Sequence, residues 1–225
     1  LQYAQSSAAS RAASRYLLVA DPANPGGAGG ALPRLPGARS EAAAVRALLP
    51  AGSSTLIAGT LADSSRVRAL ASGSTVLHFA THGVIVDDRP LESYLALANG
   101  RLTARDIYAL NLNADLVILS ACRSASGRIT GDGMIGLTRA FFYAGTPSIV
   151  ATLSDVSDIA AGFLVPRFYR SWQRHSDKAT ALREAQLALL RALRAGQVKA
   201  QTPAGEFVVP EHPALWSPFV LIGRP

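Results

Sequence analysis

His82 and Cys122 are two residues whose types and positions could together do covalent chemistry. Each follows a short apolar segment that reads as a strand, and about 40 residues separate them. A thiol attacks a carbonyl carbon well only as the thiolate, and a neighbouring imidazole supplies this by taking the proton or by holding the ion pair. The same imidazole can then protonate the leaving amine. The two residues therefore predict nucleophilic catalysis, with Cys122 as the nucleophile and His82 as the base.

The intermediate of such a reaction needs hydrogen-bond donors aimed at its developing oxyanion. The backbone N–H groups of Gly83 and Cys122 would be well placed for this on tight turns that follow the strands. Gly83 has no side chain, so the backbone can approach a substrate closely at that position. We therefore expect an oxyanion hole formed by the amides of Gly83 and Cys122.

A lone cysteine is, by type, more often an inert core residue than a catalytic one. The position of Cys122, after a strand and before a Ser/Gly-rich segment, favours catalysis, and so does the matching His-Gly pair. His78 lies inside a strand and is expected to make a structural hydrogen bond, and His175 and His212 are interpreted as surface or packing residues. No histidine has metal-ligand spacing with Cys122, and no acidic cluster is dense enough for calcium. We therefore expect no metal and no other cofactor.

The elements that would position these residues follow from the apolar pattern. Six segments predict strands, at residues 16–20, 54–58, 74–80, 115–120, 147–153 and 219–222. Helices are predicted at residues 40–49, 63–70, 103–110, 132–143, 159–175 and 177–195. Residues 90–101 predict a loop and a hairpin with Asn99 and Gly100 as its turn. The alternation of strands and helices indicates an α/β fold whose mostly parallel sheet is covered on both faces. Sites in such sheets form beyond the carboxyl ends of adjacent strands, so His82 and Cys122 would lie at the same edge if their two strands are neighbours.

The length and composition fit one packed domain. The chain has 225 residues, of which 49% are hydrophobic and 16% charged, a balance that excludes global disorder. Residues 1–15 are rich in Ala and Ser and are interpreted as the tail of a preceding region or a linker, and residues 16–225 as the domain itself. The first residue is not Met, so we expect the chain to be a piece of a longer protein.

The charge distribution bears on whether the protein binds nucleic acid, and the cysteine content bears on its cellular compartment. The formal net charge is +7, but the arginines are spread along the chain without a basic run, so no nucleic-acid partner is predicted. One cysteine allows no intramolecular disulfide, which fits a reducing compartment, and we expect a cytoplasmic protein. No apolar stretch is long enough to span a membrane. The many alanines and the excess of Arg over Lys suggest a GC-rich bacterial coding sequence.

Several motifs together carry a resemblance to a known family. FATHG at residues 79–83 and LSACRSASG at residues 119–127 are similar to the His and Cys motifs of the CHAT family. These are bacterial caspase-like domains, often found beside tetratricopeptide repeats. GDG at 131–133 with the helical segment to Gly145 is similar to the family's helix after the nucleophile, and residues 212–223 to its closing segment. The similarity covers residues 16–223.

The resemblance implies a caspase-like three-layer sandwich with a mostly parallel central sheet of about six strands. It also implies a cysteine endopeptidase that hydrolyses a protein or peptide substrate after a chosen P1 residue. It carries His82 over as the base and Cys122 as the nucleophile. The family further suggests that a flanking sensor domain or a partner protein gates the activity, with residues 123–133 as a candidate moving segment.

The chain departs from the family in the segment that normally helps to build the S1 pocket. Ser154 stands where the family usually has Trp. Asp155 and Asp158 remain, and a carboxylate at the base of the pocket would favour Arg or Lys at P1. The alternative is that either carboxylate caps the helix that begins near Ile159. Asp132 has the same two interpretations, as a cap or as a substrate-binding residue in the cleft.

Two other functions compete with the endopeptidase. A caspase-like domain that has lost activity serves as a scaffold or interaction module, and the altered Ser154 leaves this interpretation open. An acyl-transfer enzyme such as a ligase would use the same dyad, because transfer and hydrolysis share one thioester.

Overall fold

The computed structural model describes residues 14–23, 32–86, 88–120, 131–175, 177–202 and 205–225, and the side chains of residues 131–135 and 202 are not described. Its centre is a six-stranded sheet with the strand order β11-β8-β7-β3-β1-β2. The strands are β1 (Tyr16–Pro22), β2 (Ser54–Gly59), β3 (Val76–Ala80), β7 (Leu116–Leu119), β8 (Ser148–Thr152) and β11 (Phe219–Gly223). All neighbouring pairs are parallel except β11 and β8, which are antiparallel. The six-stranded, mostly parallel sheet is confirmed.

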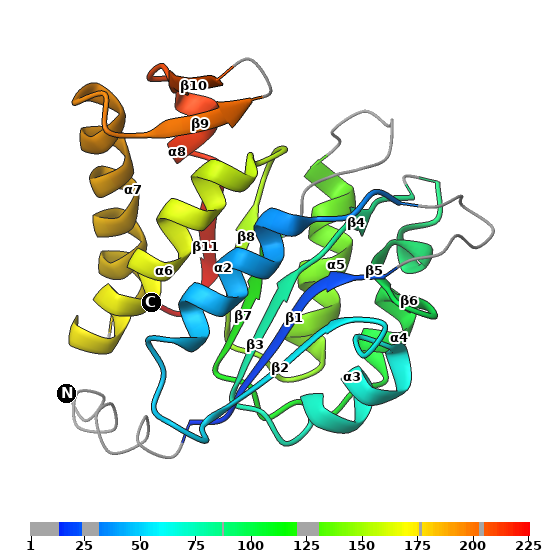
Figure 1. Cartoon of the computed structure of the whole chain (residues 1–225). Coiled ribbons are helices and arrows are strands. Elements are labelled where there is room, and N and C mark those ends of the chain that lie inside the picture. Colours follow the sequence, from blue (N-terminus) through cyan, green and yellow to red (C-terminus); the bar gives the residue numbers. More distant parts are fainter. Residues whose placement is uncertain (1–13, 24–31, 87, 121–130, 176, 203–204) are drawn as a thin grey trace.

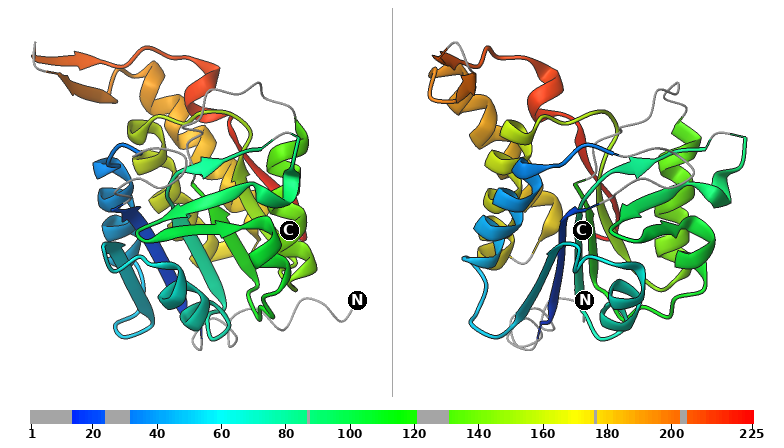
Figure 2. Two further views of the ribbon diagram at one scale, coloured as in Figure 1. Left: turned by 90° about the vertical axis from the view of Figure 1, so that its right-hand side faces the viewer. Right: turned by 45° about the vertical axis from the view of Figure 1, so that its right-hand side comes forward.

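Helices cover both faces of this sheet (Figures 1 and 2). One face carries α2 (Pro36–Arg46), α6 (Asp158–His175) and α7 (Lys178–Arg194). The other face carries α3 (Ser64–Ala71), α4 (Ala104–Tyr108) and α5 (Gly131–Tyr143). Successive strand residues point to opposite faces, so Leu18 of β1 packs in the first core and Leu17 in the second. The sheet is therefore buried on both sides, which explains why its strands are apolar throughout.

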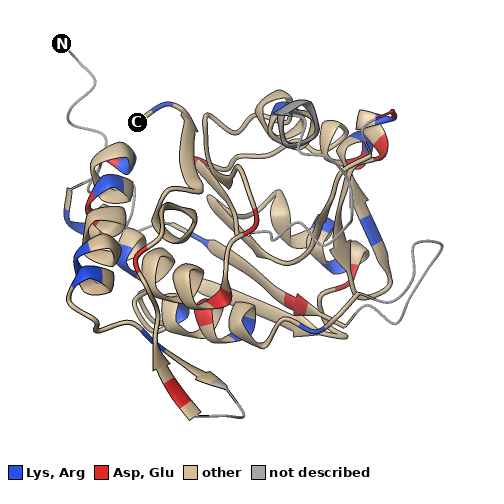
Figure 3. Ribbon diagram, turned by 90° about the horizontal axis from the view of Figure 1, so that it is seen from above, with Lys and Arg blue, Asp and Glu red and all other residues tan. Residues whose placement is uncertain are grey.

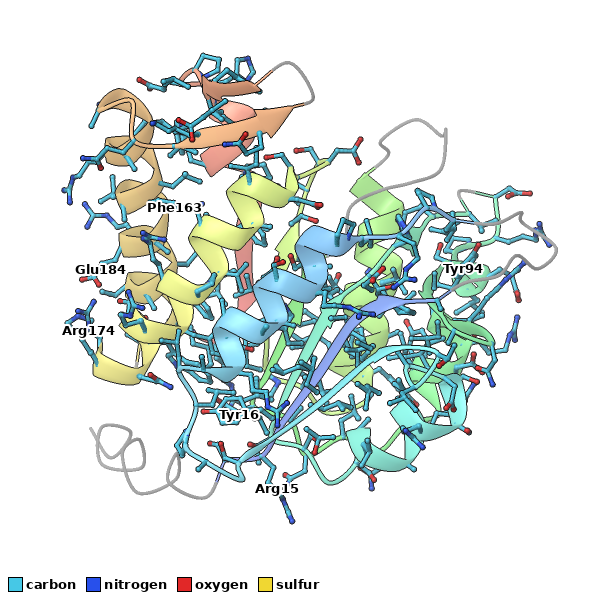
Figure 4. The ribbon with its side chains drawn as sticks, in the orientation of Figure 1. Arg15, Tyr16, Tyr94, Phe163, Arg174 and Glu184 are labelled. Atoms are coloured by element: carbon cyan, nitrogen blue, oxygen red, sulfur yellow. The ribbon has the colours of Figure 1, made fainter. Side chains whose placement is uncertain are left out.

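The outer helices α6 and α7 are joined by packing and by polar contacts. On their outer side, Arg174 lies 3.5 Å from a carboxylate oxygen of Glu184, and the Ser171 hydroxyl donates to the same carboxylate (Figure 4). The hydrogen bond from Ser171 holds the pKa of Glu184 below its ordinary value, with the nearby cations acting in the same direction. In Figure 3, Lys and Arg are distributed over several elements, as the sequence indicated.

Smaller elements lie around the sheet. A three-stranded sheet consists of β4 (Gly83–Val84), β5 (Tyr94–Leu97) and β6 (Gly100–Thr103), and a short 3-10 helix covers Pro90–Glu92. A hairpin of β9 (Lys199–Thr202) and β10 (Gly205–Val208) precedes α8 (Pro213–Trp216). The sequence did not predict this hairpin, because most of its residues are exposed and lack the alternating apolar pattern of a half-buried strand.

Element boundaries differ from the predictions in two instructive places. The hairpin of β5 and β6 pairs Leu97 with Gly100, so its turn is Ala98 and Asn99, one residue earlier than predicted. The helix predicted at 40–49 begins at Pro36 and ends at Arg46. Proline is well suited to a first helical turn because its missing N–H would be unpaired there. Asp63 is the N-cap of α3, and its side chain accepts a hydrogen bond from the amide of Arg66.

Candidate active site

The carboxyl ends of β1, β3 and β7 meet at the upper edge of the sheet in Figure 1. β3 and β7 are parallel neighbours, and their register pairs Val76 with Leu116 and Phe79 with Leu119. The paired residues are 40 positions apart, the same separation as between His82 and Cys122. Cys122 lies outside the described residues, so its placement as nucleophile stays a prediction. The expectation that the two motifs follow adjacent strands is confirmed.

His82 lies just beyond β3 and is buried, with 5% of its surface exposed. Its Nε2 atom is 2.8 Å from the carbonyl oxygen of Pro33. Because a carbonyl can only accept, Nε2 must carry the hydrogen. The other ring nitrogen, Nδ1, is buried and has no hydrogen-bond partner among the described residues. In the neutral ring, Nδ1 therefore has a free lone pair, which is what a general base requires.

The backbone on both sides of His82 is fixed by β5. The Thr81 hydroxyl donates to the carbonyl of Ala96 at 2.7 Å, and the amide of Ala96 donates to the carbonyl of His82 at 2.8 Å. Gly83 begins β4 and pairs with Leu95. These contacts hold the His-Gly pair rigidly at the edge of the sheet. The role of Gly83 in an oxyanion hole stays a prediction.

Asp21, near the end of β1, makes contacts that the sequence analysis missed. It is 3% exposed and binds the Arg34 guanidinium, with Nε at 3.0 Å from one oxygen and Nη2 close to the other. The amide of Leu35 donates to it at 2.7 Å. The hydrogen-bonded Arg34 holds the pKa of the Asp21 carboxyl below its ordinary value, against the opposing effect of burial. A signal was present in the sequence, because Asp21 follows an apolar strand just as His82 does.

Glu41 of α2 links two strands under the same edge. Its carboxylate is 2.8 Å from Nε2 of His78 on β3 and accepts a hydrogen bond of 3.0 Å from the hydroxyl of Ser120. Ser120 directly follows β7, two positions before Cys122. The His78 ring also stacks on Tyr169 of α6, with the centroids 5.9 Å apart. His78 therefore makes the structural hydrogen bond that was expected.

Comparison with known proteins gives this arrangement a family. The model of the CHAT domain matches residues 1–224. The chain belongs to the CHAT family. The resemblance inferred from the His and Cys motifs is confirmed.

Two curated relatives are similar to part of this CHAT domain. Both are tetratricopeptide repeat protein 28, from mouse at 34% identity over 122 residues and from human at 31% over 139 residues. These matches cover 54% and 62% of this chain, but only 4% and 5% of the relatives. The CHAT domain thus corresponds to a small part of much longer proteins.

Solved structures of cysteine proteinases share the fold. A crystal structure of the Arg-specific cysteine proteinase gingipain R is similar with a TM-score of 0.59 and 12% identity, and covers 97% of this chain and 48% of that one. A complex of the pro- and mature domains of RgpB from Porphyromonas gingivalis gives a TM-score of 0.54 at 12% identity, with 97% and 49% covered. The caspase-like fold predicted for the CHAT domain is confirmed.

The acidic residues predicted to bind substrate fall in different places. Asp155 and Asp158 are exposed, between the end of β8 and the first turn of α6. Among the described hydrogen bonds, the first turn of α6 is capped by the Ser157 hydroxyl, which accepts from the amide of Ala160 at 3.2 Å, and no amide donates to Asp155 or Asp158. Asp132 lies in the first turn of α5, and its side chain is outside the described part. Substrate binding by these residues stays a prediction.

Asp158 is close to α2. A Cβ atom placed on Gly37 would overlap the Asp158 side chain, so a residue larger than glycine cannot occupy position 37 without a shift.

Within the described ranges, the CHAT domain has no group of three metal-ligating side chains and no helix that is both long and apolar enough to cross a bilayer.

Proposed function

We propose that this CHAT domain is a cysteine endopeptidase in which Cys122 attacks the substrate carbonyl and His82 is the general base. The observation that carries the proposal is the hydrogen bond from His82 Nε2 to the Pro33 carbonyl, which leaves Nδ1 as the free acceptor. The pairing of β3 and β7 adds support, because the strands that precede the His and Cys motifs are parallel neighbours. The fold of the cysteine proteinase gingipain R is consistent with this chemistry.

The proposed reaction follows from the polarity of the His82 ring. Nδ1 accepts the proton of the Cys122 thiol, and the thiolate adds to the carbonyl carbon of the scissile bond. The imidazolium then gives the Nδ1 proton to the leaving amine, and a thioester remains. Water, deprotonated at Nδ1, hydrolyses the thioester. Throughout, the Pro33 carbonyl accepts from Nε2–H and stabilises the positive ring, because hydrogen bonds from a charged donor are stronger than neutral ones.

We propose that the substrate has Arg or Lys at P1. Asp155 and Asp158 follow β8, the strand next to β7, so they belong to the same edge of the sheet as His82. Neither carboxylate has an ion pair with another described side chain, so both are available to a cationic group. A neighbour in fold, gingipain R, is named as Arg-specific. A basic P1 residue would neutralise the acidic segment, whereas an acidic one would be repelled.

The test uses peptide acyloxymethyl ketones with Arg, Lys, Leu or Asp at P1, and reads the adduct by intact mass. We expect one adduct, fastest with a basic P1 residue, and absent in Cys122→Ala. His82→Ala should slow its formation by roughly 100- to 10,000-fold. His175→Ala is the matched control, because His175 is exposed and distant in the chain from the His motif. Equal rates in the two histidine variants would refute the role of His82.

The length of the relatives supports a flanking regulator. Because the curated relatives are named for tetratricopeptide repeats and the CHAT domain covers only 4% and 5% of them, we propose that a flanking repeat region gates the peptidase. The same probes on the full-length protein test this, with and without its repeat region. A domain that forms no adduct in either form would instead support the second candidate function, an inactive scaffold, which Ser154 in place of the family's usual Trp leaves open.

A further inference from the structure

Asp21, near the site, has a backbone conformation that is rare for a residue other than glycine. Its φ angle is +43°, and it is the only residue other than glycine with positive φ in the described part of the chain. This left-handed conformation costs an L-residue roughly 1–2 kcal/mol, although Asp and Asn tolerate it better than others. Such a conformation persists when surrounding contacts determine it. The backbone just after Asp21 is hydrogen-bonded to Gly59 of β2, and the described contacts of the Asp21 side chain all come from one other segment.

That segment begins directly after Pro33. The Arg34 side chain binds both oxygens of Asp21, the Leu35 amide donates to one of them, and Arg39 Nη2 lies 3.5 Å away. The peptide bond between Pro33 and Arg34 carries the carbonyl that faces His82. Anchoring the Arg34 side chain and the Leu35 amide on the same carboxylate fixes the chain on one side of this peptide, and the proline ring restricts it on the other.

The burial of Asp21 makes this anchor stronger than an ordinary surface ion pair. The Asp21 side chain is 4% exposed, whereas the side chains of Arg34 and Arg39 are 57% and 52% exposed. Solvent weakens an exposed pair to almost nothing, but a buried carboxylate must keep its donors. Loss of the Asp21 charge and of its second acceptor oxygen would therefore weaken the hold on Arg34 and on the Leu35 backbone, and with it the orientation of the Pro33 carbonyl.

We propose that Asp21 is a positioning residue for His82. It holds the Pro33 carbonyl against Nε2 of His82, and so fixes the ring orientation and the tautomer in which Nδ1 is the base. The effect on catalysis rests on the function proposed above. The effect on the His82 ring does not, because it depends only on the chain of contacts from Asp21 through Arg34 to Pro33.

Two variants test this with a matched control. Asp21→Asn keeps the size of the side chain and tolerates the positive φ. Its amide has only one acceptor oxygen, so it cannot accept hydrogen bonds from two Arg34 nitrogens on two separate oxygens. Arg34→Gln removes the fork and leaves Asp21 in place. Arg39→Gln is the control, because it also removes one positive charge next to the Asp21 carboxylate, but at a longer distance of 3.5 Å. Urea unfolding checks that each variant folds, and Arg34→Gln keeps the test valid if Asp21→Asn does not.

The first readout is the Nε2 proton of His82, observed by NMR in ¹⁵N-histidine-labelled protein and assigned with His82→Ala. We expect a signal protected from exchange with solvent in the unmodified chain and in Arg39→Gln, and its loss in Asp21→Asn and Arg34→Gln. The second readout is the rate of Cys122 alkylation by the Arg probe. A small displacement of a catalytic group costs on the order of 100-fold, so we expect a 10- to 100-fold loss in the same two variants.

The two readouts separate the two proposals. If the unmodified chain forms no Cys122 adduct but the proton signal behaves as expected, the peptidase proposal fails and the role of Asp21 stands. If the adduct forms, but Asp21→Asn and Arg34→Gln keep both the protected signal and the alkylation rate, the role of Asp21 is wrong and the peptidase proposal stands.

Discussion

The contacts of Glu41 predict a large loss of stability when its carboxylate is removed. Glu41 is 2% exposed and is hydrogen-bonded to His78 and to Ser120, both of which are buried. In Glu41→Ala, Nε2 of His78 and the Ser120 hydroxyl would both lose their acceptor. Each buried group left without a partner costs about 1–3 kcal/mol. Since two such groups lose their acceptor, we expect the free energy of unfolding to fall by about 2–6 kcal/mol.

Glu41→Gln separates the hydrogen bonds from the charge. The amide oxygen can accept from His78, and the amide nitrogen can donate to the hydroxyl oxygen of Ser120, so both contacts can be kept. We expect this variant to lose only about 1 kcal/mol, the net value of one ordinary hydrogen bond. Its effect should be much smaller than that of Glu41→Ala.

Urea unfolding followed by circular dichroism measures both variants. Ser40→Ala is the control, because Ser40 is the preceding residue of the same helix and is exposed, and such a change should stay within about 0.5 kcal/mol. The reasoning is refuted if Glu41→Ala unfolds at the same urea concentration and with the same slope as Ser40→Ala. A loss in Glu41→Gln as large as in Glu41→Ala would show that the charge, and not the hydrogen bonds, carries the effect.

Three further changes have expected outcomes. Because the pKa of Asp21 is lower in the folded chain, its contribution is complete above the unfolded value of about 3.9 and is lost as the pH falls through the folded value. In Asp21→Asn, the free energy of unfolding should therefore fall less steeply as the pH drops below about 5. Urea unfolding at a series of pH values measures this, and the same pH dependence in the variant and the unmodified chain would contradict it. Tyr169 is buried, which raises its pKa well above the ordinary value, and its hydroxyl has no partner among the described residues. Tyr169→Phe should raise stability by about 1 kcal/mol, while a lower melting temperature would mean that the hydroxyl is hydrogen-bonded. Gly223 has φ of +99°, and a Cβ there would overlap the Pro147 carbonyl, so Gly223→Ala should lower the free energy of unfolding by about 1–3 kcal/mol. The control is Gly52→Ala, where φ is +77° but the space is open, and we expect Gly223→Ala to have the lower melting temperature.

The sheet and its active edge could be predicted because both depend on local patterns. The apolar segments at β3 and β7 are flanked by polar or small residues, and parallel strands expose their carboxyl ends at a common edge. The strand order that makes β3 and β7 neighbours did not follow from these patterns and came from the structure. The boundaries of short elements did not follow, because the turn at Ala98 and the start of α2 at Pro36 depend on one or two residues each.

The partners of His82 and His78 could not be predicted in the same way. The Pro33 carbonyl reaches His82 across 49 positions, and the sequence indicated only a Gly/Pro-rich connection there. Backbone carbonyls carry no residue-specific signal, so pattern analysis cannot find them. Glu41 did carry a signal, since it falls among Ala38, Ala42 and Val45 on the buried stripe of α2. A charged residue on an apolar stripe requires a buried partner.

One helix and the segment before it connect most of the site. The segment before α2 carries the Pro33 carbonyl that faces His82. The second turn of α2 carries Glu41, which binds Ser120 at the end of β7, and its first turn carries Gly37 next to Asp158 at the start of α6. These contacts involve the proposed base, the strand that leads to Cys122 and the segment proposed to bind P1. Because packed interiors shift as units and do not deform freely, a displacement of α2 would change all three together. The activity proposed for this CHAT domain should therefore depend on the position of α2, although none of its own side chains is proposed to touch the substrate.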